Sequence, residues 1–192
     1  MKRFTNVKSG GVILTLLLLA LVSGSVWGQE TYQRVTSVSE LEAEKSFLIV
    51  NVDDQGRCIA LSNEQKKNNR GAVAVILAND KITLEQNSMA CQLVLKGSSS
   101  VGWSFYDEVN GGYLYAASSS GNYLKTQSTL DDDGRADIRF EANIATITFK
   151  GTNKRNVMQY NPNNGSPLFA CYGSESQKPL QLSLIHISEP TR

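Results

Sequence analysis

The stretch Trp103-Ser-Phe-Tyr-Asp-Glu-Val-Asn-Gly-Gly-Tyr-Leu-Tyr-Ala-Ala117 shows the pattern from which the fold can be predicted. It holds two short runs rich in aromatic residues, Trp103 to Tyr106 and Tyr113 to Ala117, and the segment between them is rich in Asp, Asn and Gly. Aromatic residues favour strands, whereas Asp, Asn and Gly favour turns. The stretch therefore predicts two strands joined by a tight turn.

Comparable runs of Val, Ile, Thr and aromatic residues recur along the chain, and Gly, Asn, Asp and Ser separate them. Spacings of roughly 8 to 12 residues between such runs are typical of all-β domains. The predicted strands cover residues 32–36, 47–52, 58–61, 72–77, 82–84, 91–95, 103–106, 113–117, 123–126, 138–140, 144–149, 157–160 and 168–172. This pattern predicts an all-β fold, either a closed barrel or a sandwich.

An internal repeat favours the closed barrel. When Phe47, Trp103 and Ile147 are aligned as position zero, apolar residues also coincide at later positions, and residues that tolerate positive φ coincide between them. The aligned sets are Ile49, Phe105 and Phe149; Gly56, Gly112 and Asn156; Cys58, Leu114 and Met158; Gly121 and Gly165; Leu124 and Leu168. Three such units predict a β-trefoil-like closed barrel with three pseudo-repeats and one core. The first unit carries a polar insertion, Glu64 to Arg70.

One helical element is expected before these strands. Ser39-Glu-Leu-Glu42 has the Ser-x-x-Glu spacing of a capping box. It predicts one short N-terminal helical turn that ends near Lys45.

Both ends of the chain are expected to lie outside the domain. A basic start, an apolar run from Val12 to Val22 and small residues up to Gly28 form the pattern of a secretory signal peptide at 1–28. That run is shorter than the roughly 18 residues that a membrane span needs. Residues 182–192 resemble a translated sequencing adapter, and we expect them to be an artefactual tail, so that no long-range contact depends on their sequence. This leaves 29–181 as a single β domain whose native C-terminus is expected to be truncated.

The composition of residues 29–181 excludes several functions. Of the 19 Lys and Arg, three lie in the signal and one in the tail, and one of the 18 Asp and Glu lies in the tail, which leaves a net charge of −2. Nucleic acid is therefore not an expected partner. The one histidine, His186, lies in the tail, so Ser-His-Asp catalysis, Cys-His catalysis and a histidine-ligated zinc site are not expected. We predict no enzyme activity, no cofactor and no metal.

The acidic segments have a structural and a chemical interpretation. Asp131-Asp-Asp-Gly-Arg-Ala-Asp137 partly fits a calcium loop, but Asp-Gly is also a strong turn signal, and we predict a solvated hairpin turn. The pairs Asp53-Asp54 and Asp107-Glu108 are of the kind that a glycosidase needs. Both pairs stand just before a Gly turn, which explains them without catalysis.

Cys58, Cys91 and Cys171 give an odd count for an exported chain. One disulfide with a free thiol is possible. Cys58 and Cys171 lie within apolar runs, and we predict buried packing instead.

The tyrosines of the second unit are the candidate binding residues. Successive side chains of a strand point to opposite faces, so Tyr113 and Tyr115 should share the face away from Leu114. Tyr106 and Tyr123 fall nearby in the same unit. Exposed aromatic clusters mark binding surfaces, while cross-strand pairing that stabilises the sheet is the alternative.

The opening segment, Val35 to Leu41 with Phe47-Leu-Ile-Val50, is similar to the start of uncharacterised secreted all-β modules of Gram-negative gut bacteria. The closing segments Met158 to Asn161, Leu168 to Tyr172 and Gln177 to Leu180 also resemble them. The resemblance implies an exported β domain, periplasmic, cell-surface or extracellular, and it carries over no catalytic residue.

Together these observations predict a secreted, non-catalytic module that binds a glycan or a cell-surface ligand. The alternatives are a protein-interaction or inhibitor module that uses the 64–70 insertion, and an accessory domain of a larger surface protein. A hydrolase that uses Asp107 is less favoured.

Overall fold

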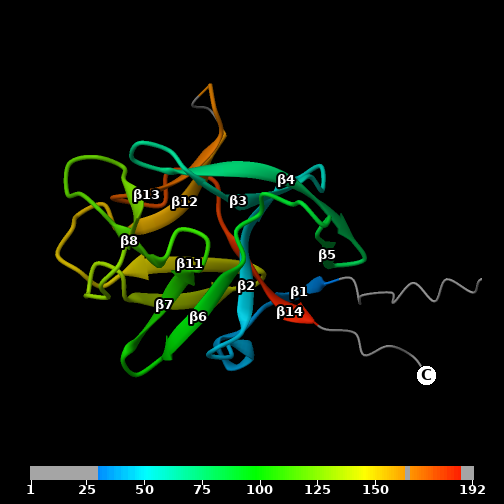
Figure 1. Cartoon of the computed structure of the whole chain (residues 1–192), viewed down its shortest axis with the longest axis horizontal. Helices are drawn as coiled ribbons and strands as arrows, with labels where there is room; N and C mark the ends of the chain where they lie inside the picture. Colours follow the sequence, from blue (N-terminus) through cyan, green and yellow to red (C-terminus); the bar gives the residue numbers. More distant parts are fainter. Residues whose placement is uncertain (1–29, 163–164, 187–192) are drawn as a thin grey trace, which may run out of the picture.

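The structure is a computed structural model that describes residues 30–162 and 165–186. The predicted signal peptide and residues 187–192 of the predicted tail lie outside the described residues. The described chain forms one 14-stranded antiparallel sheet with a ring-like arrangement (Figure 1). The strands are β1 Thr31–Val35, β2 Ser46–Val52, β3 Cys58–Gln65, β4 Arg70–Ala78, β5 Lys81–Thr83, β6 Leu93–Ser98, β7 Gly102–Asp107, β8 Gly112–Ala116, β9 Leu124–Gln127, β10 Ala136–Glu141, β11 Ile144–Phe149, β12 Val157–Asn161, β13 Leu168–Tyr172 and β14 Gln181–His186.

The all-β prediction is confirmed, since every predicted strand overlaps a strand of the structure. The helical turn is confirmed with a shift. A 3-10 turn covers Val38–Glu40, and the hydroxyl of Ser37 donates to Glu40 at 2.8 Å, so the Ser-x-x-Glu pair lies two residues earlier than predicted. This three-residue turn is the only helix in the described part of the chain. No helix among the described residues is therefore long enough to cross a bilayer.

Six strands pair in a closed path. β2 pairs with β14 and with β6, β6 pairs with β7, and β7 pairs with β10 through Ala136 and Trp103. β10 then pairs with β11, and a bridge between Ala145 and Leu180 joins β11 to the segment that leads into β14. The pairs β3–β4, β8–β9 and β12–β13 extend from this path.

The core lies inside this ring. The eleven apolar residues expected there are all buried: Phe47, Ile49, Cys58, Trp103, Phe105, Leu114, Leu124, Ile147, Phe149, Met158 and Leu168. All except Cys58 and Leu168 belong to one cluster. Cys58 packs in a second cluster with Tyr32 and Leu48, and Leu168 in a third with Ala170 and Tyr172, so the expectation of one shared centre is wrong for these two positions.

The aligned turn positions differ in backbone conformation. Gly56 has a φ of +76°, as expected, but in the second unit the positive φ, +67°, belongs to Gly111 and not to Gly112. Asn156 is absent from the described residues with positive φ. Its side-chain amide instead donates to the carbonyl of Phe149 at 2.8 Å, which fixes the turn through a side chain.

Three of the seven residues of the predicted insertion belong to strands. Glu64 and Gln65 extend β3, and Arg70 begins β4, so only residues 66–69 form the connection. Arg70 is fully buried, which corrects the expectation of a polar loop that reaches as far as this residue.

We expected no long-range contact to depend on the sequence of the tail, but its first five residues make long-range contacts. Leu182 to His186 belong to β14, which pairs with both β1 and β2 (Figure 1). Leu182 is fully buried opposite Ile49. The physical reason is that an apolar strand is needed between β1 and β2, and Leu182 and Leu184 supply alternate apolar side chains. The resemblance of 182–192 to an adapter stays a prediction.

Truncation of the core should destabilise the fold at corresponding positions of two units. We expect Phe105→Ala and Phe149→Ala each to lower the free energy of unfolding by about 3 to 5 kcal/mol, because each leaves a cavity in the central cluster. Denaturant unfolding measures both losses. The exposed Val109 provides the control, since Val109→Ala should change stability by no more than about 0.5 kcal/mol. A loss below about 1 kcal/mol for either Phe variant would contradict this core.

Leu182→Ala should lower the free energy of unfolding by about 2 to 5 kcal/mol, because the side chain is buried in the ring. Thermal or denaturant unfolding of the full chain checks this. If the variant unfolds like the parent chain, β14 does not pair with β2 in solution.

Candidate functional site

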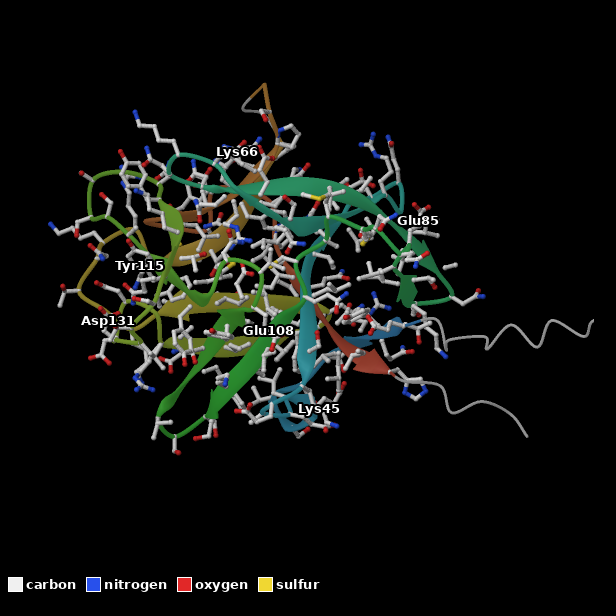
Figure 2. The ribbon with its side chains drawn as sticks, viewed as in Figure 1. Lys45, Lys66, Glu85, Glu108, Tyr115 and Asp131 are labelled. Atoms are coloured by element: carbon white, nitrogen blue, oxygen red, sulfur yellow. The ribbon has the colours of Figure 1, made fainter. Side chains whose placement is uncertain are left out.

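The predicted alternation of β8 is observed. Leu114 and Ala116 are buried in the core, while Tyr113 and Tyr115 are partly exposed on the opposite face. Figure 2 shows Tyr115 on the side of the molecule that carries β8, at the opposite end of the view from Glu85. A strand with one face in the core must present its other face outward, so the burial of Leu114 positions both tyrosines.

Tyr106 of β7 lies directly across from Tyr113. The two residues are paired in the β7–β8 register, and their ring centroids are 5.0 Å apart in an edge-to-face arrangement at 65°. Such aromatic pairs contribute about 0.5 to 1.5 kcal/mol beyond burial. The structure therefore brings together two residues of the predicted binding set. It also supplies the cross-strand aromatic contact that we gave as the alternative role of these tyrosines.

Tyr123 directly precedes β9, the strand that pairs with the strand of Tyr115. Tyr115 is paired with Lys125 of β9, and Tyr123 lies two residues before Lys125 on the same face. Gly121 allows the ring of Tyr123 to pack closely, because a Cβ at this glycine would stand 2.5 Å from the ring. The four partly exposed tyrosines of β7, β8 and the position just before β9 are called the tyrosine surface: Tyr106, Tyr113, Tyr115 and Tyr123.

Two lysines border the tyrosine surface. The ammonium group of Lys96 lies 5.3 Å from the centroid of Tyr106, and that of Lys125 lies 5.6 Å from the centroid of Tyr123. Both distances are within the range of cation–π attraction. Sequence reasoning did not identify these lysines. The signal for Lys125 was available, because residues two apart on a strand point to the same face and Lys125 stands two residues after Tyr123.

A buried ion pair supports the tyrosine surface from inside. Asp107, the last residue of β7, and Arg70, the first of β4, are both fully buried, and Arg70 Nη1 is 2.7 Å from Asp107 Oδ2. Arg70 also donates to the hydroxyl of Thr126 in β9 at 3.0 Å and to the carbonyl of Ser62 at 2.8 Å. The pair therefore ties β4 to the two strands that flank β8.

Asp107 also shapes the turn before β8. One oxygen accepts from the backbone N–H groups of Val109 and Asn110 at 3.0 Å each, and the other accepts from the Asn110 side chain at 2.8 Å. Burial by itself would raise the pKa of Asp107. The Asn110 hydrogen bonds and the Arg70 charge outweigh burial, and the pKa is lowered from its ordinary value. Asp107 is therefore an ionised structural residue of the turn.

The other acidic segments also form turns. Asp53 accepts from the backbone N–H of Gln55 and from the backbone and side chain of Arg57, whose Nε lies at 2.6 Å. Asp131 accepts from the backbone of Gly134 at 3.2 Å and from the side chain of Gln127 at 2.7 Å, which confirms the predicted turn. The turn is not the predicted hairpin, because it joins β9, which pairs with β8, to β10, which pairs with β11 and β7. Within residues 30–162 and 165–186, no three His, Cys, Asp or Glu side chains are grouped to hold a metal ion.

The three cysteines are buried and unpaired, as predicted. Burial raises the pKa of Cys58 and of Cys91 to about 12, and it raises that of Cys171 beyond the usual range. The thiols are therefore protonated at neutral pH, which suits packing and not nucleophilic chemistry.

No family model and no curated protein matches the chain. Among solved structures, the chain is similar to the crystal structure of the lysenin pore, with 11% sequence identity and a TM-score of 0.47. The match covers 83% of this chain and 50% of that chain, so this chain spans about half the length of that protein. A similarity of this size carries no argument about function.

We expect Asp107→Asn to destabilise the protein by about 3 to 5 kcal/mol, because it leaves the buried guanidinium of Arg70 without its counter-charge. Denaturant unfolding measures the loss. The matched control is Asp54→Asn, an exposed position where the free energy of unfolding should change by no more than about 0.5 kcal/mol.

The same pair should make stability depend on pH. Since the pKa of Asp107 is lowered on folding, its contribution to the free energy of unfolding is present above about pH 3.9 and is lost as the pH falls through the pKa of the folded state. The variant should therefore lose less stability than the parent chain over that acidic range. Equal losses would contradict the role of the pair.

Proposed function

We propose that this chain is a secreted, non-catalytic module that binds a glycan or another cell-surface ligand through the tyrosine surface. The observation that supports this is the group of four partly exposed tyrosines on β7, on β8 and just before β9. Flat rings with a polar edge provide apolar contact area and hydrogen-bonding groups together, which suits a sugar ring. Export itself rests on the signal-peptide pattern of residues 1–28.

We further propose that the scaffold is a β-trefoil-like closed barrel with three pseudo-repeats. The pairings support it. The first strand of each aligned unit, β2, β7 or β11, pairs with the second strand of its unit. In the first two units it also pairs with the last strand, and in the third β11 is bridged to Leu180, just before β14. On this scheme β1 and β5 are additions to the first unit. The tyrosine surface then belongs to the second unit alone, which would leave one such surface on the molecule.

The hydrolase alternative receives less support than binding. Its main candidate, Asp107, is fully buried and is engaged by Arg70 and Asn110, whereas a general acid must reach its substrate. The interaction-module alternative relied on the 64–70 insertion. Only residues 66–69 connect β3 and β4, and Lys66 is held by a hydrogen bond to Ser166 across to the β12–β13 segment. This short connection offers a small surface for a partner.

Substitution of the tyrosine surface should weaken binding while the fold is retained. After a glycan array of the chain without residues 1–28 identifies a ligand, we expect Tyr113→Ala and Tyr115→Ala each to weaken its binding about tenfold, since truncated interface aromatics commonly cost more than 1 kcal/mol. Stability should change by only about 1 kcal/mol, the scale of a cross-strand pair. Calorimetric titration and thermal unfolding measure the two effects.

Two controls separate the ring from the sheet. Tyr115→Phe keeps the ring and should retain most of the affinity, and Ile144→Ala removes an exposed apolar side chain from β11 and should change neither measurement. The opposite pattern, a large loss of stability with unchanged binding, would show that the tyrosines serve only the sheet.

A further inference from the structure

We propose that a cleft between the β2–β3 turn and β12 is a second binding site, which takes a single neutral pyranose ring. The cleft has a volume of about 430 Å³, within the usual range for small-molecule sites. It is lined by residues of β2, β3 and β12 and by Lys178, so it shares no residue with the tyrosine surface. The choice of a sugar as the ligand rests on the proposed function, whereas the cleft itself does not.

The floor of the cleft is held in place by neighbouring strands. Tyr160 is 6% exposed, its ring centroid is 5.2 Å from that of Phe169, and its backbone exchanges hydrogen bonds of 3.2 and 3.0 Å with Lys178. Asn51 is 4% exposed, and its amide nitrogen donates to the carbonyl of Pro179 at 2.8 Å. A ligand would therefore meet groups that are already ordered, which lowers the entropic cost of binding.

These buried groups retain hydrogen-bonding capacity. The amide oxygen of Asn51 accepts no hydrogen bond from the described residues, although the residue is almost entirely buried. Burial raises the pKa of Tyr160, so its hydroxyl remains protonated and can donate at neutral pH. One acceptor and one donor at the base of a cleft can fix the orientation of a ligand that has adjacent hydroxyl groups.

The rim of the cleft favours a neutral ligand. The lining includes two acids, Asp53 and Asp54, and two bases, Arg57 and Lys178, so an ion of either sign would meet repulsion as well as attraction. Asp53 and Arg57 already form an ion pair at 2.6 Å. Hydroxyl groups both donate and accept, and can use all of these side chains. The half-buried Ile59 and the ring of Tyr160 provide apolar surface for the C–H face of a sugar ring.

The test is a titration of the ¹⁵N-labelled chain without residues 1–28, followed by heteronuclear NMR. The probes are methyl β-D-glucopyranoside, methyl β-D-galactopyranoside and methyl α-D-mannopyranoside, with D-glucuronate as the charged comparison. We expect at least one neutral pyranoside to give saturable shifts at the side-chain amide of Asn51 and the backbone amides of Gln55 and Lys178. D-glucuronate should bind more weakly.

Lys178→Ala keeps the backbone pairing with Tyr160 and should weaken pyranoside binding about tenfold, the loss of one hydrogen bond from a charged donor. Lys45→Ala is the matched control, because Lys45 is exposed and stands at the start of β2, whereas Asn51 lies near its end. Tyr113→Ala should also leave these shifts unchanged.

The proposal is overturned if no probe gives saturable shifts at these three residues, or if Lys178→Ala and Lys45→Ala behave alike. Tighter binding of D-glucuronate would overturn the neutral class. Shifts confined to the tyrosine surface would overturn the cleft while supporting the proposed function. Cleft shifts in a chain whose tyrosine variants bind glycans normally would support the cleft and contradict the tyrosine surface.

Discussion

The buried ion pair between Arg70 and Asp107 holds the candidate binding surface in place. Arg70 begins β4 and Asp107 ends β7, and the same guanidinium donates to Thr126 of β9. Removing two charges from water costs free energy unless they are paired and hydrogen-bonded. The strands must therefore keep the register that brings Arg70 and Asp107 together. Asp107 also accepts the N–H groups of the turn into β8. The position of β8, and of the tyrosines it carries, therefore depends on this pair.

The strands and the direction of their side chains could be predicted from the sequence because both are local properties. Alternation needs only neighbouring residues, so the burial of Leu114 and the partial exposure of Tyr113 followed from a single stretch. The same reasoning identified the buried positions Phe47, Phe105 and Phe149. Turns also depend on neighbouring residues and were predicted, although the positive φ in the second unit belongs to Gly111 and not to Gly112.

The features that sequence reasoning missed depend on residues far apart in the chain. Arg70 stands in a polar stretch and is buried only because Asp107, Ser62 and Thr126 surround it. The cleft likewise combines the turn after β2 with Tyr160 and Lys178. Residues 182–186 were set aside for their resemblance to an adapter, yet alternate leucines were enough to fill the place between β1 and β2. A strand position inside a ring requires apolar alternation and backbone pairing, and many sequences can meet that requirement.

The two proposed sites, the tyrosine surface and the cleft, would suit different parts of one glycan. The four tyrosines are partly exposed on neighbouring strands, which would suit an extended chain of sugar rings, whereas the cleft has the volume for a small molecule. Each would bind weakly, because a single ring offers few atoms from which to gain affinity. A polymer that reached both would bind the second site at a high effective concentration, and its affinity would exceed that of either site by orders of magnitude. If both proposed sites bind sugars, a polysaccharide that spans them would be held more tightly than a free monosaccharide in the cleft.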